Sequence, residues 1–179
     1  ISIEKKMNLK KHIRSIADYP KKGILFRDIT TLIKNEKAFA ESVDQIIERS
    51  KKYKVDKIAA IESRGFIFAS AVSYLLKKPF ILLRKKNKLP AETYSIDFEL
   101  EYGTATIEVH KDSIDKGDSV LIIDDLIATG GTAKAAAQLI EISGGNVSAF
   151  IFAINLFDLG GSDNLIKKGY CVENLMDFP

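Results

Sequence analysis

The sequence contains a single cysteine, no tryptophan and only two histidines among its 179 residues. Cys171 therefore has no partner for an intrachain disulfide, and the chain has no cysteine and histidine cluster with the spacing of a metal site. These absences exclude a disulfide-rich secreted domain and a structural zinc module. They favour a reducing, cytoplasmic environment, and we expect His12 and His110 to take no part in catalysis.

Long hydrophobic runs and a strong charge imbalance are also missing. The longest apolar stretches, residues 65–76 and 149–156, are shorter than the ~20 residues that a membrane-spanning helix requires. The 27 Lys and Arg exceed the 24 Asp and Glu by a net charge of only +3, which is not typical of a dedicated nucleic-acid binder. We therefore expect neither a membrane nor a nucleic-acid partner, and small anionic molecules remain plausible ligands.

What is present is the composition of an ordinary globular domain. With 46% hydrophobic and 28% charged residues, the chain can bury a core without disulfides. At roughly 150 residues per domain, we expect a single domain over residues 1–179.

Short continuous apolar runs alternate with helical patterns in the middle of the chain. The runs at residues 57–61, 80–84 and 119–123 predict strands that are buried on both faces, and residues 66–76 predict an apolar helix. Such strands are typical of a parallel sheet in an α/β fold, flanked by helices. Functional groups are then expected at the carboxyl ends of the strands.

Two other regions have different patterns. Residues 9–16 carry apolar side chains at helical spacing, residues 20–28 suggest an irregular connection, and residues 31–53 predict a second helix. Residues 94–109 alternate apolar and polar side chains with period two. They predict an antiparallel hairpin or a mobile flap about Gly103.

Residues 120–132, with the sequence VLIIDDLIATGGT, are the most informative segment. The turn after the strand opens a helix, and Gly130 and Gly131 can adopt backbone angles that let N–H groups converge on an anion at the helix N-terminus. The nucleotide-binding motifs G-x-x-x-x-G-K-[ST] and G-x-G-x-x-G do not occur. We predict a site for a phosphate monoester. This predicted cradle consists of Ala128, Thr129, Gly130, Gly131 and Thr132.

Two adjacent carboxylates, Asp124 and Asp125, precede this cradle at the expected end of the strand. They would repel a phosphate placed directly on them, but they can accept hydrogen bonds from the vicinal hydroxyls of a ribose one sugar ring away. We predict that they bind ribose. Contact of either acid with the shell of a Mg²⁺ ion stays open as an alternative.

This segment resembles the signature of the type I phosphoribosyltransferases, and the ATGGT wording is similar to that of the members that act on adenine. Five further segments resemble the same family in the same order. The resemblance implies a mostly parallel sheet with flanking helices, an N-terminal hood at about residues 1–33, a core at about 34–179 and a flexible β flap over the active site. The further segments are residues 19–30 (YPKKGILFRDIT), 62–68 (ESRGFIF), 82–90 (LLRKKNKLP), 100–110 (LEYGTATIEVH) and 155–161 (NLFDLGG).

The resemblance also implies an activity. Members of this kind transfer the 5-phosphoribosyl group of 5-phosphoribosyl 1-pyrophosphate (PRPP) to adenine, giving AMP and pyrophosphate in purine salvage. It implies Mg²⁺ held mainly by substrate phosphates and water, and a homodimer. Two alternatives stay open: a transferase for hypoxanthine, guanine or xanthine, and a non-catalytic, nucleotide-sensing regulator that binds nucleic acid.

Roles for individual residues follow from the resemblance alone. Glu101 would accept a proton from adenine as the glycosidic bond forms, and Tyr102 of the same flap would shield the reacting centre from water. A strained non-proline peptide is implied near Ser63, with a cis bond as one form that it can take. Base choice is assigned to Leu25, Phe26 and Arg27. Pyrophosphate binding is assigned to Ser63, Arg64, Gly65, Arg84 and Lys88, the last of these sometimes acting across a dimer interface.

Overall fold

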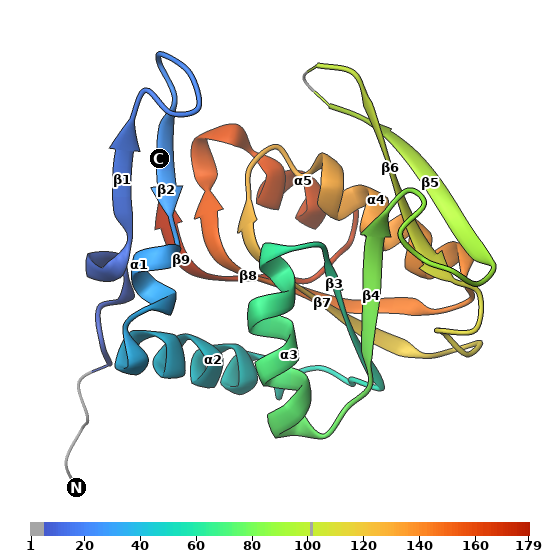
Figure 1. Ribbon diagram of the computed structural model, residues 1–179. Coiled ribbons are helices and arrows are strands. Elements are labelled where there is room, and N and C mark those ends of the chain that lie inside the picture. The colour runs from blue at the N-terminus through green and yellow to red at the C-terminus, as the bar shows by residue number, and fades with distance from the viewer. Residues whose placement is uncertain (1–5, 101) are drawn as a thin grey trace, which may run out of the picture. The chain divides into compact units, whose positions relative to one another are not determined.

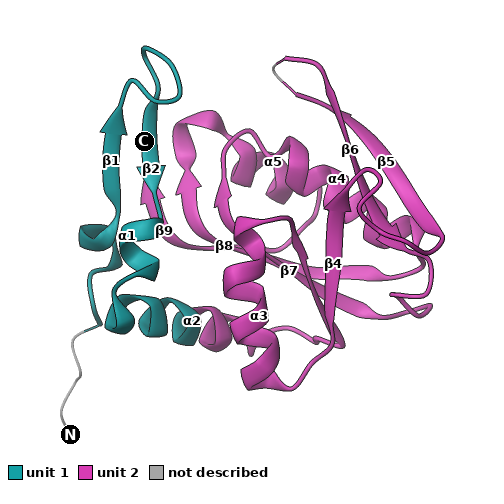
Figure 2. Cartoon of the chain, viewed as in Figure 1, with its two compact units in different colours: residues 1–45 teal, residues 46–179 magenta. Residues whose placement is uncertain are grey.

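The structure is a computed structural model that describes residues 6–100 and 102–179. The chain forms two compact units, residues 1–45 and 46–179, and the boundary lies inside helix α2 (Glu36–Ser50) (Figure 2). The hood that the sequence suggests at about residues 1–33 stays a prediction. None of the helices in the described part of the chain is long and apolar enough to span a bilayer.

The first unit contains a two-stranded antiparallel sheet and short helices (Figure 1). In this sheet Ser15 pairs with Arg27, and Ile16 pairs with Phe26. The unit's elements are the 3₁₀ helix η1 (Leu9–His12), strands β1 (Arg14–Ala17) and β2 (Leu25–Asp28), helix α1 (Thr30–Ile33) and the first part of α2.

The expectations for this unit were partly wrong. The predicted helix over residues 9–16 is a single 3₁₀ turn followed by β1, and the connection predicted over residues 20–28 ends in β2. The pairing of β1 with β2 supplies backbone hydrogen bonds that local spacing does not reveal, and it overrides the weak helical pattern. The helix predicted over residues 31–53 is divided in two, because the Asn35 side chain accepts the Ala38 N–H at 2.9 Å and caps α2.

The second unit is built on a seven-stranded sheet with the order β5-β6-β4-β3-β7-β8-β9. The strands from β4 to β9 in this order pair in parallel, whereas β6 pairs antiparallel with both β4 and β5. The predicted α/β fold with a mostly parallel sheet is confirmed. The strands are β3 (Lys57–Ile61), β4 (Phe80–Lys85), β5 (Thr93–Glu99), β6 (Thr104–His110), β7 (Ser119–Ile127), β8 (Asn146–Leu156) and β9 (Val172–Phe178).

Helices cover both faces of this sheet. Helix α3 (Arg64–Leu76) packs on β3, β4 and β7, and helix α4 (Gly131–Ile142) packs on the other face against β5 and β8 (Figure 1). Helix α5 (Gly161–Lys167) and the 3₁₀ helix η2 (Phe157–Leu159) follow β8. The alanine-rich face of α4 packs closely on the strands, in a core that includes Ile122, Phe150 and Phe152.

The predicted hairpin is present as β5 and β6, with Ser95 opposite Glu108 and Ile96 opposite Ile107. Its apolar face packs against the core through Ile96, Phe98 and Ile107. Its polar face carries hydroxyl and carboxylate side chains. Period-two alternation therefore predicted this element correctly.

Asp28 provides a pH-dependent contribution to the stability of the first unit. Its buried carboxylate accepts hydrogen bonds from the Thr30 hydroxyl at 2.6 Å, the Thr30 N–H at 2.9 Å and the Arg14 Nε at 3.0 Å. The Thr30 hydroxyl is the largest cause that lowers the pKa of Asp28 from 3.8 to about 2, with Arg14 adding to it and burial opposing it. The Asp28 carboxylate thus accepts the N–H of Thr30, the first residue of α1.

Replacement of this side chain tests the contribution. Asp28→Ala should lower the free energy of unfolding at neutral pH by about 1–3 kcal/mol, because hydrogen bonds to an ionised group are lost. Because the folded-state pKa is depressed, the contribution is present above the ordinary value of 3.8 and disappears as pH falls toward about 2. Urea unfolding at several pH values measures it, with the exposed Asp44→Ala as control. A difference from wild type that stays constant down to pH 2 would contradict the assignment.

Candidate functional site

A pocket of about 450 Å³ lies at the carboxyl ends of β3 and β7. In the sheet, β4 is the neighbour of β3 on one side, whereas β7 and then β8 follow on the other side. This is the point where the strand order reverses, and open α/β sheets bind ligands in such a crevice. The pocket brings together nine of the predicted site residues. They are Ser63, Arg64, Asp124, Asp125, Ala128, Thr129, Gly130, Gly131 and Thr132.

The end of β7 is open toward the pocket because its neighbour is shorter. The pairing of β3 with β7 extends to Ala59 opposite Ile122, and β3 itself ends at Ile61. Strand β7 continues to Ile127 through its pairing with β8. The acidic pair therefore lies inside a strand rather than at its end, which corrects the expectation, and its free edge faces the loop after β3.

The predicted cradle consists of the three-residue connection between β7 and α4, residues 128–130, and the first two residues of α4. Gly130 has a φ of 88°, in the left-handed region that favours glycine. The first N–H groups of α4 have no partner within the helix and point toward this connection. The arrangement provides the N–H groups and the helix dipole that a phosphate monoester requires.

Gly161 packs against residues 128–130 of this connection. The Gly161 N–H donates to the Ala128 carbonyl at 3.1 Å. A Cβ atom at Gly161 would lie 2.4 Å from the Ala128 oxygen and 2.8 Å from the Gly130 nitrogen, so only glycine fits. Gly161 lies in a segment that resembles the family, but its role was not predicted, because this contact joins two distant parts of the chain.

The two acids differ in their surroundings. Asp125 is buried and pairs with Arg64, whose Nε lies 2.8 Å from the carboxylate Oδ2. The Asp124 Oδ1 accepts the Asp125 N–H at 2.8 Å. Burial, and next the adjacent Asp125 carboxylate, raise the pKa of Asp124 well above its usual range, against the opposing effect of Arg64. Asp124 therefore holds its proton more strongly than a free aspartate does.

Gly65 lies at the start of α3, and its small size makes room for Asp124. A Cβ atom at Gly65 would lie 2.8 Å from Asp124 Oδ1 and 3.2 Å from the Ile123 carbonyl oxygen. The glycine was predicted for pyrophosphate binding, and the structure adds a steric reason for its small size. The non-proline peptide bond between Glu62 and Ser63 is cis.

Glu62 organises the cationic side of the pocket and was not predicted. Its carboxylate accepts the Lys85 N–H at 2.5 Å and lies 3.6 Å from the Arg84 guanidinium. Within the described residues, the Nε of Arg84 is buried without a hydrogen-bond partner.

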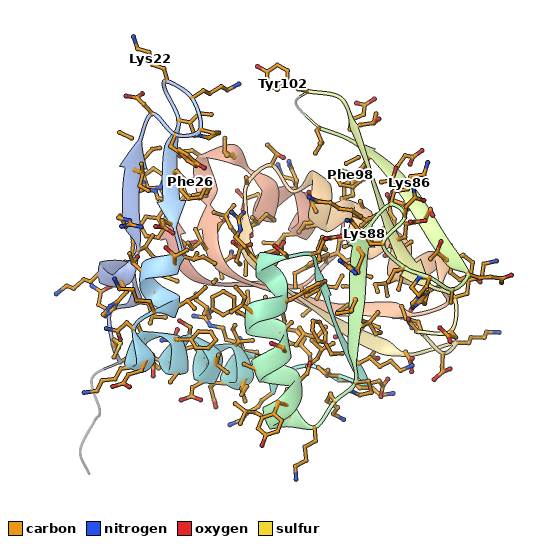
Figure 3. The ribbon with its side chains drawn as sticks, viewed as in Figure 1. Lys22, Phe26, Lys86, Lys88, Phe98 and Tyr102 are labelled. Atoms are coloured by element: carbon orange, nitrogen blue, oxygen red, sulfur yellow. The ribbon has the colours of Figure 1, made fainter. Side chains whose placement is uncertain are left out.

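The remaining predicted residues lie outside this pocket's lining. Lys88 is exposed in the loop after β4, and Tyr102 is exposed near the tip of the hairpin (Figure 3). Glu101 lies outside the described residues. Leu25, Phe26 and Arg27 are on β2 of the first unit, where the Phe26 ring packs edge-on against Tyr19 with ring centroids 5.1 Å apart.

The fold and the pocket together define a class of protein. A mostly parallel sheet carries a glycine-rich turn at a helix N-terminus, an acidic pair and an arginine at one crevice. This combination is suited to a phosphorylated ribose and is typical of a ribosyl-phosphate-binding α/β enzyme.

Comparison with known proteins identifies the family. Residues 28–164 match the phosphoribosyl transferase domain family. The chain is 83% identical over 173 residues to the adenine phosphoribosyltransferase of Pelagibacter ubique (strain HTCC1062), covering 97% of this chain and 99% of that one. It therefore belongs to the phosphoribosyltransferase family.

Solved structures agree with this assignment. The adenine phosphoribosyltransferase of Thermoanaerobacter pseudethanolicus has a TM-score of 0.91 at 46% identity, covering 95% of this chain and 98% of that one. The Saccharomyces cerevisiae enzyme, complexed with adenine and an imino-altritol bisphosphate, has a TM-score of 0.87 at 34% identity, covering 94% and 96%. The likeness extends over nearly the whole chain.

The contact at Gly161 can be tested directly. Gly161→Ala should displace the phosphate cradle and lower kcat/KM by about 100-fold, the typical effect of a displacement of about 1 Å at a reacting site. Steady-state kinetics and calorimetric AMP binding measure the change. Gly160→Asn is a matched control, because a Cβ atom there meets nothing within 4 Å and asparagine tolerates its φ of 72°. Wild-type AMP affinity in Gly161→Ala would refute the role of this contact.

Proposed function

We propose that the chain is an adenine phosphoribosyltransferase, which transfers the 5-phosphoribosyl group of PRPP to adenine and releases AMP and pyrophosphate. The observation that carries this proposal is that the predicted phosphate cradle, the acidic pair and Arg64 all line the same pocket. The 83% identity to an enzyme of this name supports the same activity. The whole chain would act as one catalytic domain.

The donor would bind along the pocket in a defined direction. The cradle of residues 128–132 would hold the 5′-phosphate, and Asp124 and Asp125 would accept hydrogen bonds from the ribose hydroxyls. Arg64 already pairs with Asp125 at 2.8 Å, so its guanidinium lies beside the ribose position and can also contact the leaving pyrophosphate. Ser63, Gly65, Arg84 and Lys88 are proposed to complete the pyrophosphate site. Arg84 does not line the pocket itself, but its guanidinium lies 3.6 Å from the carboxylate of Glu62, which does.

Adenine recognition is proposed for Leu25, Phe26 and Arg27. Adenine presents an acceptor at N1 and a donor at N6, so one N–H and one C=O at strand spacing would select it. Strand β2 pairs with β1 in a two-stranded sheet, and such an edge strand presents N–H and C=O groups on its other side. Hypoxanthine and guanine have the opposite pattern and would leave these groups unpaired.

Mg²⁺ is the proposed cofactor. Carboxylate oxygens are suitable Mg²⁺ ligands, and Asp124 and Asp125 both line the pocket. In residues 6–100 and 102–179, no group of three or more His, Cys, Asp or Glu side chains is arranged to hold a metal ion. A donor set of this kind fits an ion held mainly by substrate phosphates and water. The bound ion would neutralise charge on the leaving pyrophosphate.

A homodimer and a cytoplasmic location complete the proposal. Helix α3 exposes Ile67, Tyr74 and Leu75, which lie on one stripe of the helix and are 37%, 81% and 54% exposed. An apolar stripe of this size supports self-association, and sedimentation of the protein at the mass of one chain would contradict it.

The exposed free thiol of Cys171 is suited to a reducing compartment.

The substrate assignment is tested by an assay of the four purine bases with PRPP and Mg²⁺. AMP should form from adenine, and IMP, GMP and XMP should not form at comparable rates, because the wrong bases leave buried polar groups unpaired. Preferential turnover of hypoxanthine, guanine or xanthine would replace the proposal with the sister activity. Tight nucleic-acid binding without turnover would instead support the regulator.

The role of Glu101 has its own test. Glu101→Ala should lower kcat by about 10²–10⁴-fold, the usual contribution of a general base, and leave PRPP affinity within about threefold. Steady-state kinetics and calorimetry measure the two effects separately. Glu99→Ala, which removes an exposed carboxylate from the same hairpin, should keep wild-type turnover. An unchanged kcat in Glu101→Ala would refute the proposed role.

A further inference from the structure

Glu108 is a buried carboxylate that the proposed mechanism does not use. It lies on β6, opposite Arg84 of β4 on one side and opposite Ser95 of β5 on the other. Only 8% of the residue is exposed. An ionised side chain at this depth is costly unless donors surround it.

Three donors from two other segments satisfy this carboxylate. Its Oε2 accepts hydrogen bonds from the Ser95 hydroxyl at 2.6 Å and the Thr93 hydroxyl at 3.0 Å, and its Oε1 accepts the Asn87 N–H at 2.7 Å. The Ser95 hydroxyl is the largest cause that lowers the pKa of Glu108, and the Lys86 ammonium group adds a smaller effect. The side chain therefore stays ionised at neutral pH.

The bond from Asn87 has a particular consequence for the loop after β4. Asn87 lies between Lys86 and Lys88, both of which are exposed (Figure 3). Its φ of 65° is left-handed, a conformation that asparagine tolerates. The hydrogen bond to Glu108 thus fixes the Asn87 backbone, while the exposed lysines on either side can contact a ligand.

We infer that Glu108 is a positioning residue for pyrophosphate binding, which anchors Asn87 and thereby presents Lys88 to the donor. Glu108 itself touches no substrate. Because Thr93 and Ser95 belong to β5, the same carboxylate joins the hairpin to the loop after β4 that contains Lys86 and Lys88, here called the lysine loop. This inference rests on the proposed function, in which Lys88 contacts the pyrophosphate group.

Ligands that differ only in the pyrophosphate group separate positioning from a general structural role. PRPP and AMP share the phosphate cradle and the ribose acids, but only PRPP carries pyrophosphate. Glu108→Ala should weaken calorimetric PRPP binding in the presence of Mg²⁺ by at least about tenfold, as expected for the loss of a hydrogen bond to a charged group. AMP affinity should stay within about twofold.

Two conservative variants distinguish the effect of side-chain length from the effect of side-chain charge. Glu108→Gln keeps an oxygen that can accept the Asn87 N–H and should retain PRPP affinity within about threefold. Glu108→Asp keeps the charge but is one methylene shorter, so it should weaken PRPP binding selectively, and it serves as the test if Glu108→Ala does not fold. Asp97→Ala is the matched control. Its carboxylate, on the same face of the hairpin, accepts a hydrogen bond from Thr106 at 2.5 Å, and its removal should change neither affinity.

A double-variant cycle with Lys88→Ala completes the experiment. If Glu108 acts through the lysine loop, the two losses should not add. The PRPP dissociation constant of the double variant should then exceed that of the more affected single variant by no more than about twofold. Fully additive losses, or a parallel loss of AMP affinity in Glu108→Ala and Glu108→Asp, would overturn the inference. Unchanged PRPP affinity in Lys88→Ala would instead refute the proposed pyrophosphate role of Lys88, which is a separate failure.

Discussion

The placement of two adjacent carboxylates at one sheet edge is the constraint on which the rest of the site depends. Asp124 and Asp125 repel each other, and the site satisfies them by different means. Asp125 pairs with Arg64, and Asp124 accepts a backbone N–H and occupies the space that Gly65 leaves open. Both Arg64 and Gly65 come from the loop and helix after β3, so β3 must lie next to β7. This neighbourhood places the pocket at the carboxyl ends of the two strands.

Carboxylates also organise the cationic side of the site. Glu62 holds the end of β4 through the Lys85 N–H and the Arg84 guanidinium, and Glu108 holds the next loop through the Asn87 N–H. Each acid fixes backbone or guanidinium donors in a position that ammonium groups alone could not define. This pairing of acids with bases explains how an anion site can be concentrated in a protein whose net charge is only +3.

The parts of the fold that the sequence predicts are those with a strong local signal. The apolar run at residues 57–61 coincides with β3, and period-two alternation identified the hairpin, because both patterns report directly on burial. The strand β1 was missed because its stability comes from pairing with β2 rather than from its own residues. Beyond residue 143 no loop motif marked the elements, and β8, α5 and β9 were not assigned.

The same distinction applies to the site. The phosphate cradle was predictable because glycines and hydroxyls in one short segment have a local chemical meaning. Gly161, Glu62 and Glu108 act through contacts with residues at least 20 positions away, and a lone glycine or glutamate has no such signature. Sequence reasoning therefore finds the residues that face a ligand more readily than those that hold them in place.

The electrostatics of the acidic pair bear on how a polyanion enters the pocket. Two full negative charges beside the cradle would oppose the approach of a phosphate and a pyrophosphate. Burial and the neighbouring carboxylate raise the pKa of Asp124 and so disfavour its charged form. Arg64 neutralises Asp125 while keeping its other guanidinium nitrogens free of that bond, since the short contact of 2.8 Å is made by Nε. A phosphate group could then bind the same guanidinium without breaking the ion pair, so in the proposed mode of donor binding one side chain would link the ribose and pyrophosphate positions.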